Sequence, residues 1–167
     1  MELFWAPQSI LGYSNTGGFG IDGCVSSLIG ASLAESNKLF FGVVGDLAFF
    51  YDMNSIGNRH VSNNIRLIIV NNGRGTEFRN YGHQGAKFGE NADMYIAAAG
   101  HYGKKSHLLL KHYAEDLGFE YISASNKEEY LNNVEKYLNP KLQINLFCLK
   151  FLRIVRTKVK ALELWKI

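Results

Sequence analysis

Two oxygen-bearing side chains, those of Asp46 and Asn72, each follow a short apolar run that is typical of a buried strand. In an open parallel sheet, ligands bind in the crevice beyond the carboxyl ends of the strands. If the two strands are close neighbours, both side chains face that crevice. Carboxylate and amide oxygens suit Mg²⁺, which often shares its coordination shell with phosphate oxygens. The pair therefore indicates a magnesium site that bridges to a diphosphate.

The neighbours of Asp46 favour the same chemistry. A helix after Asp46 would present free backbone N–H groups and a positive dipole end to an anion, and Gly45 allows a sharp turn before it. The alternative is structural, because an aspartate after a strand is often a helix cap and Asn71-Asn72-Gly73 is a common turn. Spacing alone leaves both interpretations open.

Strand and helix patterns alternate along the chain and would position these residues. Apolar runs at residues 39–44 and 65–70 predict two buried parallel strands, joined by a helix at 49–59 in a right-handed β-α-β unit. Further helices are predicted at residues 24–35, 93–99, 108–117 and 126–138, and a further strand at 119–123. The fold class expected is α/β, with an open, mostly parallel sheet covered by helices on both faces.

The composition is that of an ordinary globular domain, with 47% apolar and 20% charged residues. No apolar run reaches the ~18 residues that a membrane span needs, and the N-terminus does not resemble a signal peptide. Cys24 and Cys148 are too few and too far apart for a disulfide framework or a zinc site. We therefore expect a cytoplasmic protein with no membrane partner.

The net charge of +3 is unevenly distributed. Residues 141–167 hold seven basic and one acidic side chain, whereas residues 1–140 hold 11 basic and 14 acidic ones. We divide the chain accordingly into a domain at 1–140 and a basic tail at 141–167. The mildly acidic body gives no reason to expect a nucleic-acid partner. One interpretation of the tail is a basic amphipathic segment that binds a membrane surface or nucleic acid. Its apolar residues, however, mark no clean helical face.

The motif around Asp46 resembles the signature of thiamine diphosphate-dependent enzymes. That signature is Gly-Asp-Gly or Gly-Asp-Leu, a spacer and then Asn-Asn. This chain has Gly45-Asp46-Leu47, and Asn71-Asn72 ends about 26 residues after Asp46, with Asp52 and Asn54 between them. Upstream, Gly20-Ile21-Asp22-Gly23 with Ser26 is similar to a stretch in the menaquinone-pathway carboligase branch, the 2-succinyl-5-enolpyruvyl-6-hydroxy-3-cyclohexene-1-carboxylate synthases. The resemblance covers residues 13–76 and implies the thiamine diphosphate-binding fold.

The resemblance implies a role for each matched position. Side-chain oxygens of Asp46 and Asn72, and the backbone carbonyl of Arg74, would coordinate Mg²⁺. Ile21 would hold the two rings of the cofactor in a bent conformation. The other positions expected to contact the cofactor are Gly45, Leu47, Ala48 and Gly75.

The implied activity is that of a 2-oxo acid decarboxylase or carboligase acting on a small 2-oxo acid. The cofactor would take up the electrons as carbon dioxide leaves. Its activation needs a glutamate from a pyrimidine-binding domain, which we expect on another chain or a second subunit, so this chain alone should be inactive. A catalytically inactive truncated remnant is the alternative. Another type of α/β phosphate binder would need a lysine-containing phosphate loop or clustered acidic residues, and the sequence has neither.

Three positions depart from the synthase pattern. Thr16 replaces an arginine, Glu77 replaces an apolar residue and Arg74 replaces a glycine. We therefore expect a substrate other than the menaquinone precursor. Glu77 and His83 are the candidate catalytic side chains, since a histidine in a glycine-rich loop could relay protons near neutral pH. The alternative for His83 is an ordinary surface or capping role.

The sequence also gives an expectation for the extent of the domain. We expect the domain to be incomplete and truncated at its N-terminus. We also hypothesise that residues 141–167 are a frame-shifted end of the same domain. Permitted codons for residues 146–160, read two bases later, can encode a strand and an acidic turn like those that close this domain in the family.

Overall fold

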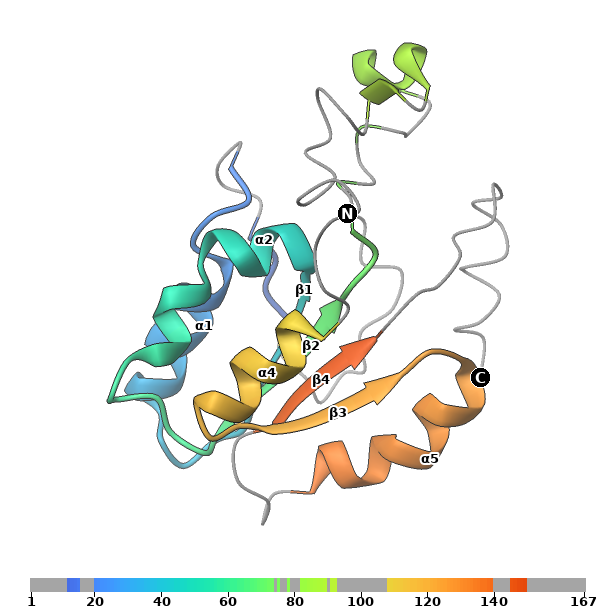
Figure 1. Cartoon of the computed structure of the whole chain (residues 1–167). Coiled ribbons are helices and arrows are strands. Elements are labelled where there is room, and N and C mark those ends of the chain that lie inside the picture. The colour runs from blue at the N-terminus through green and yellow to red at the C-terminus, as the bar shows by residue number, and fades with distance from the viewer. Residues whose placement is uncertain are drawn as a thin grey trace.

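The sheet of this protein is small, open and entirely parallel. The computed structural model describes residues 12–15, 20–73, 75, 78, 82–89, 91–92 and 108–139, and the backbone of 145–149. Its strands pair in the order β1-β2-β4-β3 (Figure 1). Their bounds are β1 (Phe40–Gly45), β2 (Ile65–Val70), β3 (Glu120–Ala124) and β4 (Asn145–Leu149). The predicted α/β class with a parallel sheet is confirmed.

Helices connect and cover these strands. The described ones are α1 (Cys24–Ala34), α2 (Asp46–Tyr51), α4 (Leu109–Asp116) and α5 (Lys127–Leu138), with the 3₁₀ helices η1 (Met53–Gly57) and η3 (Gln84–Phe88). The Asn126 side chain caps α5 by accepting a hydrogen bond from Glu129 N at 2.9 Å. Gly118 follows α4 with φ +81°, the conformation that favours glycine after a helix. The helix predicted at 93–99 lies outside the described residues.

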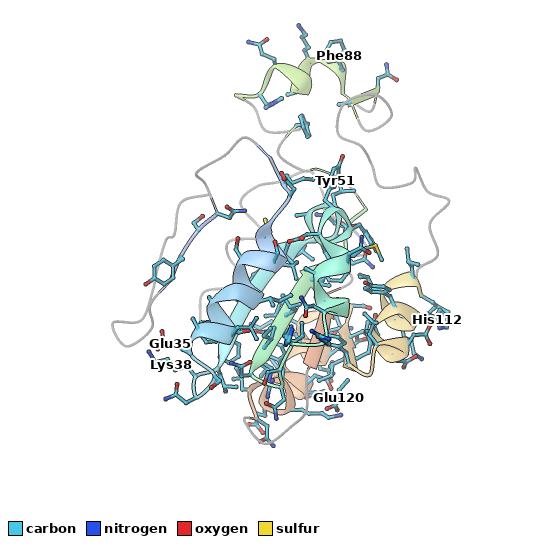
Figure 2. All side chains as sticks on the ribbon, turned by 90° about the vertical axis from the view of Figure 1, so that its left-hand side faces the viewer. Glu35, Lys38, Tyr51, Phe88, His112 and Glu120 are labelled. Atoms are coloured by element: carbon cyan, nitrogen blue, oxygen red, sulfur yellow. The ribbon has the colours of Figure 1, made fainter. Side chains whose placement is uncertain are left out.

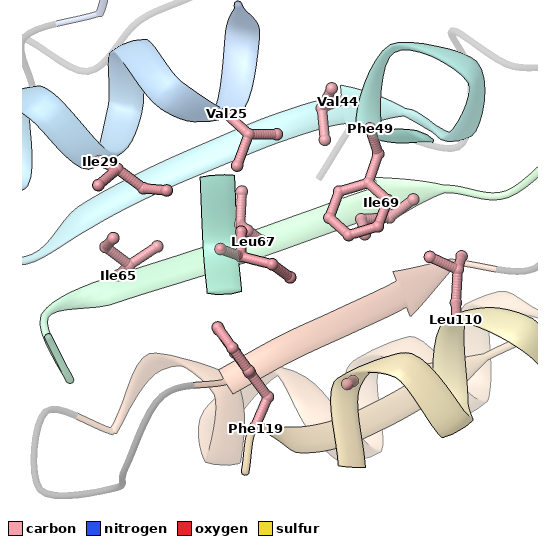
Figure 3. Close-up of a cluster of buried hydrophobic side chains, with 11 residues drawn as sticks. Val25, Ile29, Val44, Phe49, Ile65, Leu67, Ile69, Leu110 and Phe119 are labelled. Atoms are coloured by element: carbon pink, nitrogen blue, oxygen red, sulfur yellow. The ribbon is translucent and has the colours of Figure 1, made fainter. Parts of the chain in front are cut away.

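The main core lies on one face of the sheet. Alternate side chains of β2, those of Ile65, Leu67 and Ile69, point to this face and are buried. They pack against α1, α2, η1 and α4, as Figure 3 shows for most of the cluster. The remaining buried members are Val25, Ile29, Val44, Phe49, Ile56, Leu110, Ala114 and Phe119.

Helix α5 covers the opposite face. Its Tyr137 joins Ile122 and Ala124 of β3 in a second buried cluster, and Ile68 of β2 packs against it. Arg66 is also buried on this face. Its Nη2 donates to Asn139 O at 3.1 Å, just beyond α5, and its Nη1 donates to two carbonyls near the start of β2. Burial lowers the pKa of Arg66. Helices therefore lie on both faces, as predicted.

Strand β1 is less buried than the sequence analysis expected. It lies at the edge of the four-stranded sheet that the described residues form, and Phe41 and Val43 on the α5 face are 47% and 69% exposed. The physical reason is the strand order, because α5 packs on β3 and β4 at the other side of the sheet. The Phe41 ring meets α5 edge-on at Tyr137, with ring centroids 5.9 Å apart. The prediction of full burial was wrong for this strand.

Two further differences concern element bounds. The helix expected at 49–59 is instead the short α2 followed by η1, with Asp52 between them. Within residues 141–167, where no element was expected, β4 lies between β2 and β3 in the sheet. No helix within the described ranges is long and apolar enough to cross a membrane.

Gly42 allows α1 to lie close against β1, which gives a testable prediction. A Cβ at Gly42 would approach Leu28 Cδ2 to 2.7 Å and Leu67 Cδ2 to 3.0 Å. We expect Gly42→Val to lower the free energy of unfolding by about 1–3 kcal/mol through overpacking. Gly30→Ala is the control, because a Cβ there meets no atom within 4 Å. It should be neutral or stabilising by about 0.5–1 kcal/mol in urea denaturation. Equal stability of both variants would contradict this packing.

Candidate functional site

The carboxyl ends of β1 and β2 bring the two predicted metal ligands to one edge of the sheet. Gly45 pairs with Val70 in the parallel register, so the two neighbouring strands end at the same level. Asp46 follows directly on β1 as the first residue of α2 (Figure 1), and Asn71 follows directly on β2. The expectation that the strands are close neighbours is met.

The Asp46 carboxylate is buried and binds backbone from both strand ends. Asp46 is only 1% exposed to solvent. Oδ2 accepts a hydrogen bond from Gly73 N at 2.7 Å, and Oδ1 accepts one from Leu47 N at 3.0 Å. The first of these joins the end of β1 to the turn after β2 across 27 positions of sequence. Asp46 therefore fixes that turn against the start of α2.

Asn72 lies within the same turn. Its N–H donates to Val70 O at 3.1 Å, and the next residue, Gly73, has φ +75°. Glycine adopts this left-handed conformation without the steric cost that other residues incur. Asn72 is half-buried and adjoins the N–H group bonded to Asp46. The turn that contains Asn72 thus lies against the Asp46 carboxylate, and the convergence of the two side chains stays a prediction.

The topology places a change in the direction of strand order at the same edge. The connection from β1 to β2 packs on the face with the main core, whereas α5, which connects β3 to β4, packs on the other face. The chain therefore reverses its direction across the sheet between β2 and β4. Open parallel sheets bind ligands beyond the strand ends at such a reversal. The turn at Asn71–Gly73 leaves the sheet at this point.

The donor chemistry at this edge fits a hard cation. Asp46 offers a carboxylate, and Asn72 offers an amide oxygen in the same turn. Oxygen ligands of these kinds suit Mg²⁺. In the part of the chain that the structure describes, no group of three or more His, Cys, Asp or Glu residues could hold a metal.

The loop that carries Ile21 is fastened to the start of α1. Ile21 is 43% exposed, and its carbonyl accepts a hydrogen bond from Cys24 Sγ at 3.5 Å. Ser26 N, in the first turn of α1, donates to Asp52 Oδ2 at 2.6 Å. Asp52 directly follows α2, so this contact ties the loop and α1 to the segment that begins at Asp46.

The other predicted cofactor contacts divide between described and undescribed positions. Gly45 precedes α2 in an extended conformation, and Leu47 and Ala48 are half-buried within α2. Gly75 is also half-buried. The predicted third metal ligand, Arg74, the candidate catalytic Glu77 and the divergent Thr16 lie outside the described residues.

His83 caps a short helix in the structure. Its Nδ1 accepts a hydrogen bond from Gly85 N at 2.9 Å at the start of η3. Its ring also meets the Phe78 ring edge-on, with centroids 4.9 Å apart. Figure 2 shows Phe88, at the end of η3, well away from Tyr51 of α2. The contacts of His83 are local, which corresponds to the capping role given above as the alternative.

Sequence reasoning assigned no role to two residues that shape this site. Gly73 supplies the N–H bonded to Asp46, and Asp52 supplies the oxygen bonded to Ser26 N. The signal for Gly73 was its place after Asn71-Asn72, which predicted a turn but not the partner of its N–H group. For Asp52 the signal was its place in the signature, which did not predict that its side chain contacts the start of α1.

The conformation of Gly73 gives a second prediction. Nothing lies within 4 Å of a Cβ added there, so an alanine would be strained only by its backbone conformation. We expect Gly73→Ala to lower stability by about 1–2 kcal/mol, the cost of a left-handed conformation for an L-residue. Gly73→Asn is the matched variant, because asparagine tolerates this region better. Thermal unfolding should rank the wild type first and Gly73→Asn above Gly73→Ala, and any other order would count against a left-handed Gly73.

Fold and site together define an α/β domain in which Asp46 at the end of β1 binds the turn after β2. The comparisons with known proteins give its relatives. Over 140 residues the chain is 34% identical to the 2-succinyl-5-enolpyruvyl-6-hydroxy-3-cyclohexene-1-carboxylate synthase of Bacteroides thetaiotaomicron, an alignment that covers 84% of this chain and 24% of that protein. This chain is a partial homologue of these synthases.

Other synthases of the same name are also similar to this chain. The one from Christiangramia forsetii is 35% identical over 128 residues, which is 77% of this chain and 21% of that protein. The one from Desulfotalea psychrophila is 44% identical over 70 residues, or 42% of this chain and 13% of that protein. The chain thus spans at most about a quarter of the length of these curated relatives. No protein-family model matches the chain.

Proposed function

We propose that this chain binds the diphosphate of thiamine diphosphate through a Mg²⁺ ion held by Asp46 and Asn72. The observation that carries the proposal is the 2.7 Å hydrogen bond from Gly73 N to Asp46 Oδ2. It draws the turn after β2 onto the buried carboxylate at the end of β1. This contact supports the proposal because Asn72 directly precedes Gly73 in that turn.

The contacts of Asp46 are compatible with a metal ligand. An ionised carboxylate has about four acceptor sites, so the same group can accept N–H hydrogen bonds and also bind a cation. Mg²⁺ binds proteins through one or two such groups and completes its shell with phosphate oxygens and water. In this proposal, Asp46 and Asn72 contribute side-chain oxygens and Arg74 contributes its backbone carbonyl.

The relatives support the choice of cofactor. The stretch that resembles the thiamine diphosphate signature, residues 13–76, contains the site. Most of the chain is also homologous to part of the 2-succinyl-5-enolpyruvyl-6-hydroxy-3-cyclohexene-1-carboxylate synthases. Neither observation requires that this chain act on the substrate of those synthases.

The remaining roles are those that the resemblance implies for each matched position. When bound, thiamine diphosphate supplies an electron sink for the decarboxylation of a small 2-oxo acid. Gly45, Leu47, Ala48 and Gly75 line the diphosphate end, and Ile21 supports the rings. The chain works as the diphosphate-binding part of a decarboxylase or carboligase. A pyrimidine-binding domain, on another chain or a second subunit, completes the site, so this chain alone is inactive.

Calorimetric titration tests the proposal. The full chain is titrated with thiamine diphosphate in Mg²⁺ and again after removal of divalent cations, with thiamine as the control ligand because it lacks the diphosphate. We expect binding of thiamine diphosphate in Mg²⁺ only, and no binding of thiamine. Affinity that does not depend on Mg²⁺ would contradict the metal bridge. No binding at all would favour the inactive remnant.

A further inference from the structure

Asp52 caps a helix that belongs to a different part of the chain. Helix α1 begins after Gly23, which has no side chain to bind the N–H groups of the first turn. The Asp52 carboxylate supplies this contact from 26 positions away, since its Oδ2 accepts from Ser26 N at 2.6 Å. Such a carboxylate satisfies a helical N–H group that lacks a partner and interacts favourably with the helix dipole.

The backbone of Asp52 is itself held in place. Asp52 lies directly after α2, and its N–H donates to Phe49 O at 3.1 Å. Its carbonyl accepts from Ser55 N at 3.1 Å and from Ser55 Oγ at 2.7 Å, at the start of η1. The side chain therefore projects from a fixed point on the segment that begins with Asp46.

Hydrogen bonds connect the loop with Ile21 to the start of α1. Cys24 Sγ donates to Ile21 O at 3.5 Å, Ser26 Oγ donates to Gly23 O at 3.3 Å and Ser27 N donates to Gly23 O at 3.0 Å. A shift of the first turn of α1 is thus transmitted to the loop. In Figure 2 Tyr51, next to Asp52 in sequence, lies at the end of the domain opposite Glu35 and Lys38, which follow α1.

We infer that Asp52 is a positioning residue that sets the place of Ile21 relative to Asp46. The inference rests on the proposed function, in which thiamine diphosphate meets Asp46 through its diphosphate and Ile21 through its rings. One end of the cofactor site is built on α2 and the other on the loop before α1. Asp52 is the side chain that hydrogen-bonds the two to each other.

Two ligands separate this role from a general effect on folding. Thiamine diphosphate spans both ends of the site, whereas inorganic pyrophosphate occupies only the metal and diphosphate end. With Mg²⁺ present, Asp52→Ala should weaken thiamine diphosphate binding about 10- to 100-fold, the range for a lost hydrogen bond to a charged group. Pyrophosphate affinity should change by no more than about 2-fold, as for a remote substitution.

Two further variants serve as controls. Asp52→Asn retains an acceptor oxygen for Ser26 N, so its affinity for thiamine diphosphate should lie close to that of the wild type. Asp116→Ala removes an exposed carboxylate at the end of α4 and should behave as the wild type. In the ligand-free chain, amide exchange in the first turn of α1 should accelerate in Asp52→Ala and not in Asp116→Ala.

The outcomes distinguish failure of the inference about Asp52 from failure of the proposed function. If Asp52→Ala weakens both ligands equally, or neither, Asp52 does not position Ile21 and this inference is wrong while the metal site stands. If the wild type binds neither ligand in Mg²⁺, the proposed function fails and the inference fails with it. Selective loss of thiamine diphosphate, rescued by Asp52→Asn, is the result that the structure predicts.

Discussion

Replacing Asp46 with alanine is expected to lower the Mg²⁺-dependent affinity for thiamine diphosphate by more than about 100-fold. Loss of a residue that merely orients a metal ligand typically costs 10- to 100-fold, so loss of the only carboxylate proposed to bind the metal should cost more. Calorimetric titration of both proteins in Mg²⁺ measures the difference. The affinity that remains should no longer depend on Mg²⁺.

The same substitution also affects the fold, and the experiment must separate the two effects. Alanine leaves Gly73 N without its Asp46 acceptor, at a cost of about 1–3 kcal/mol. Titrations therefore belong at a temperature at which circular dichroism shows both proteins folded. Asp116→Ala, which removes an exposed carboxylate far along the chain, is the control and should bind as the wild type does. A folded Asp46→Ala protein with retained affinity would overturn the assignment.

The second large effect concerns the helix that begins at Asp46. Phe49 is 0% exposed and meets the rings of Phe50 and Tyr113 edge-on, with centroids 5.7 Å and 6.3 Å away. We expect Phe49→Ala to lower the free energy of unfolding by about 3–5 kcal/mol, the usual cost of deleting a buried aromatic ring. Urea denaturation followed by circular dichroism gives this value directly.

Tyr51 provides a matched control for Phe49 in the same helix. It is 67% exposed, so Tyr51→Ala should change stability by no more than about 0.5 kcal/mol. Because Phe49 anchors α2 beneath the proposed site, Phe49→Ala should also weaken cofactor binding at temperatures where it remains folded. A loss of stability below about 1 kcal/mol would show that Phe49 does not anchor α2 in the core.

Strands with a strong local signal were predicted well, and those that depend on the whole sheet were not. The β-branched run of β2 was predicted with its observed bounds, because a central strand is buried on both faces. The run of β1 looks similar in sequence, yet Phe41 and Val43 are exposed. Whether a strand lies at an edge is decided by the order of the strands, which a local pattern does not contain.

The same reasoning explains β4. Four of its five residues, 146–149, are apolar, but the strand lies among basic residues that suggested a separate tail. Pairing on both sides, with β2 and β3, places this segment inside the sheet. Parallel pairing joins residues far apart in sequence, so a short-range sequence pattern does not predict it. The proposals for a domain limit near residue 140 and for a frame-shifted end of the domain remain predictions.

For the candidate site, the sequence predicted the types of the ligand residues and their place at the ends of two strands. Asp46 and Asn72 were chosen because oxygen ligands followed two buried runs, and the register confirms that these strands end together. The roles of Gly73 and Asp52 depend on hydrogen bonds across 27 and 26 positions. Such contacts arise only when the strands and α1 pack, so the sequence alone could not assign them.

Electron paramagnetic resonance of bound Mn²⁺ tests the central claim most directly, since Mn²⁺ accepts the same oxygen ligands as Mg²⁺. The claim predicts that Mn²⁺ binds the wild-type chain with thiamine diphosphate and shows hyperfine coupling to the phosphorus nuclei of the diphosphate. The coupling should vanish in Asp46→Ala. Mn²⁺ bound without phosphorus coupling, or with a coupling that Asp46→Ala leaves unchanged, would contradict the claim.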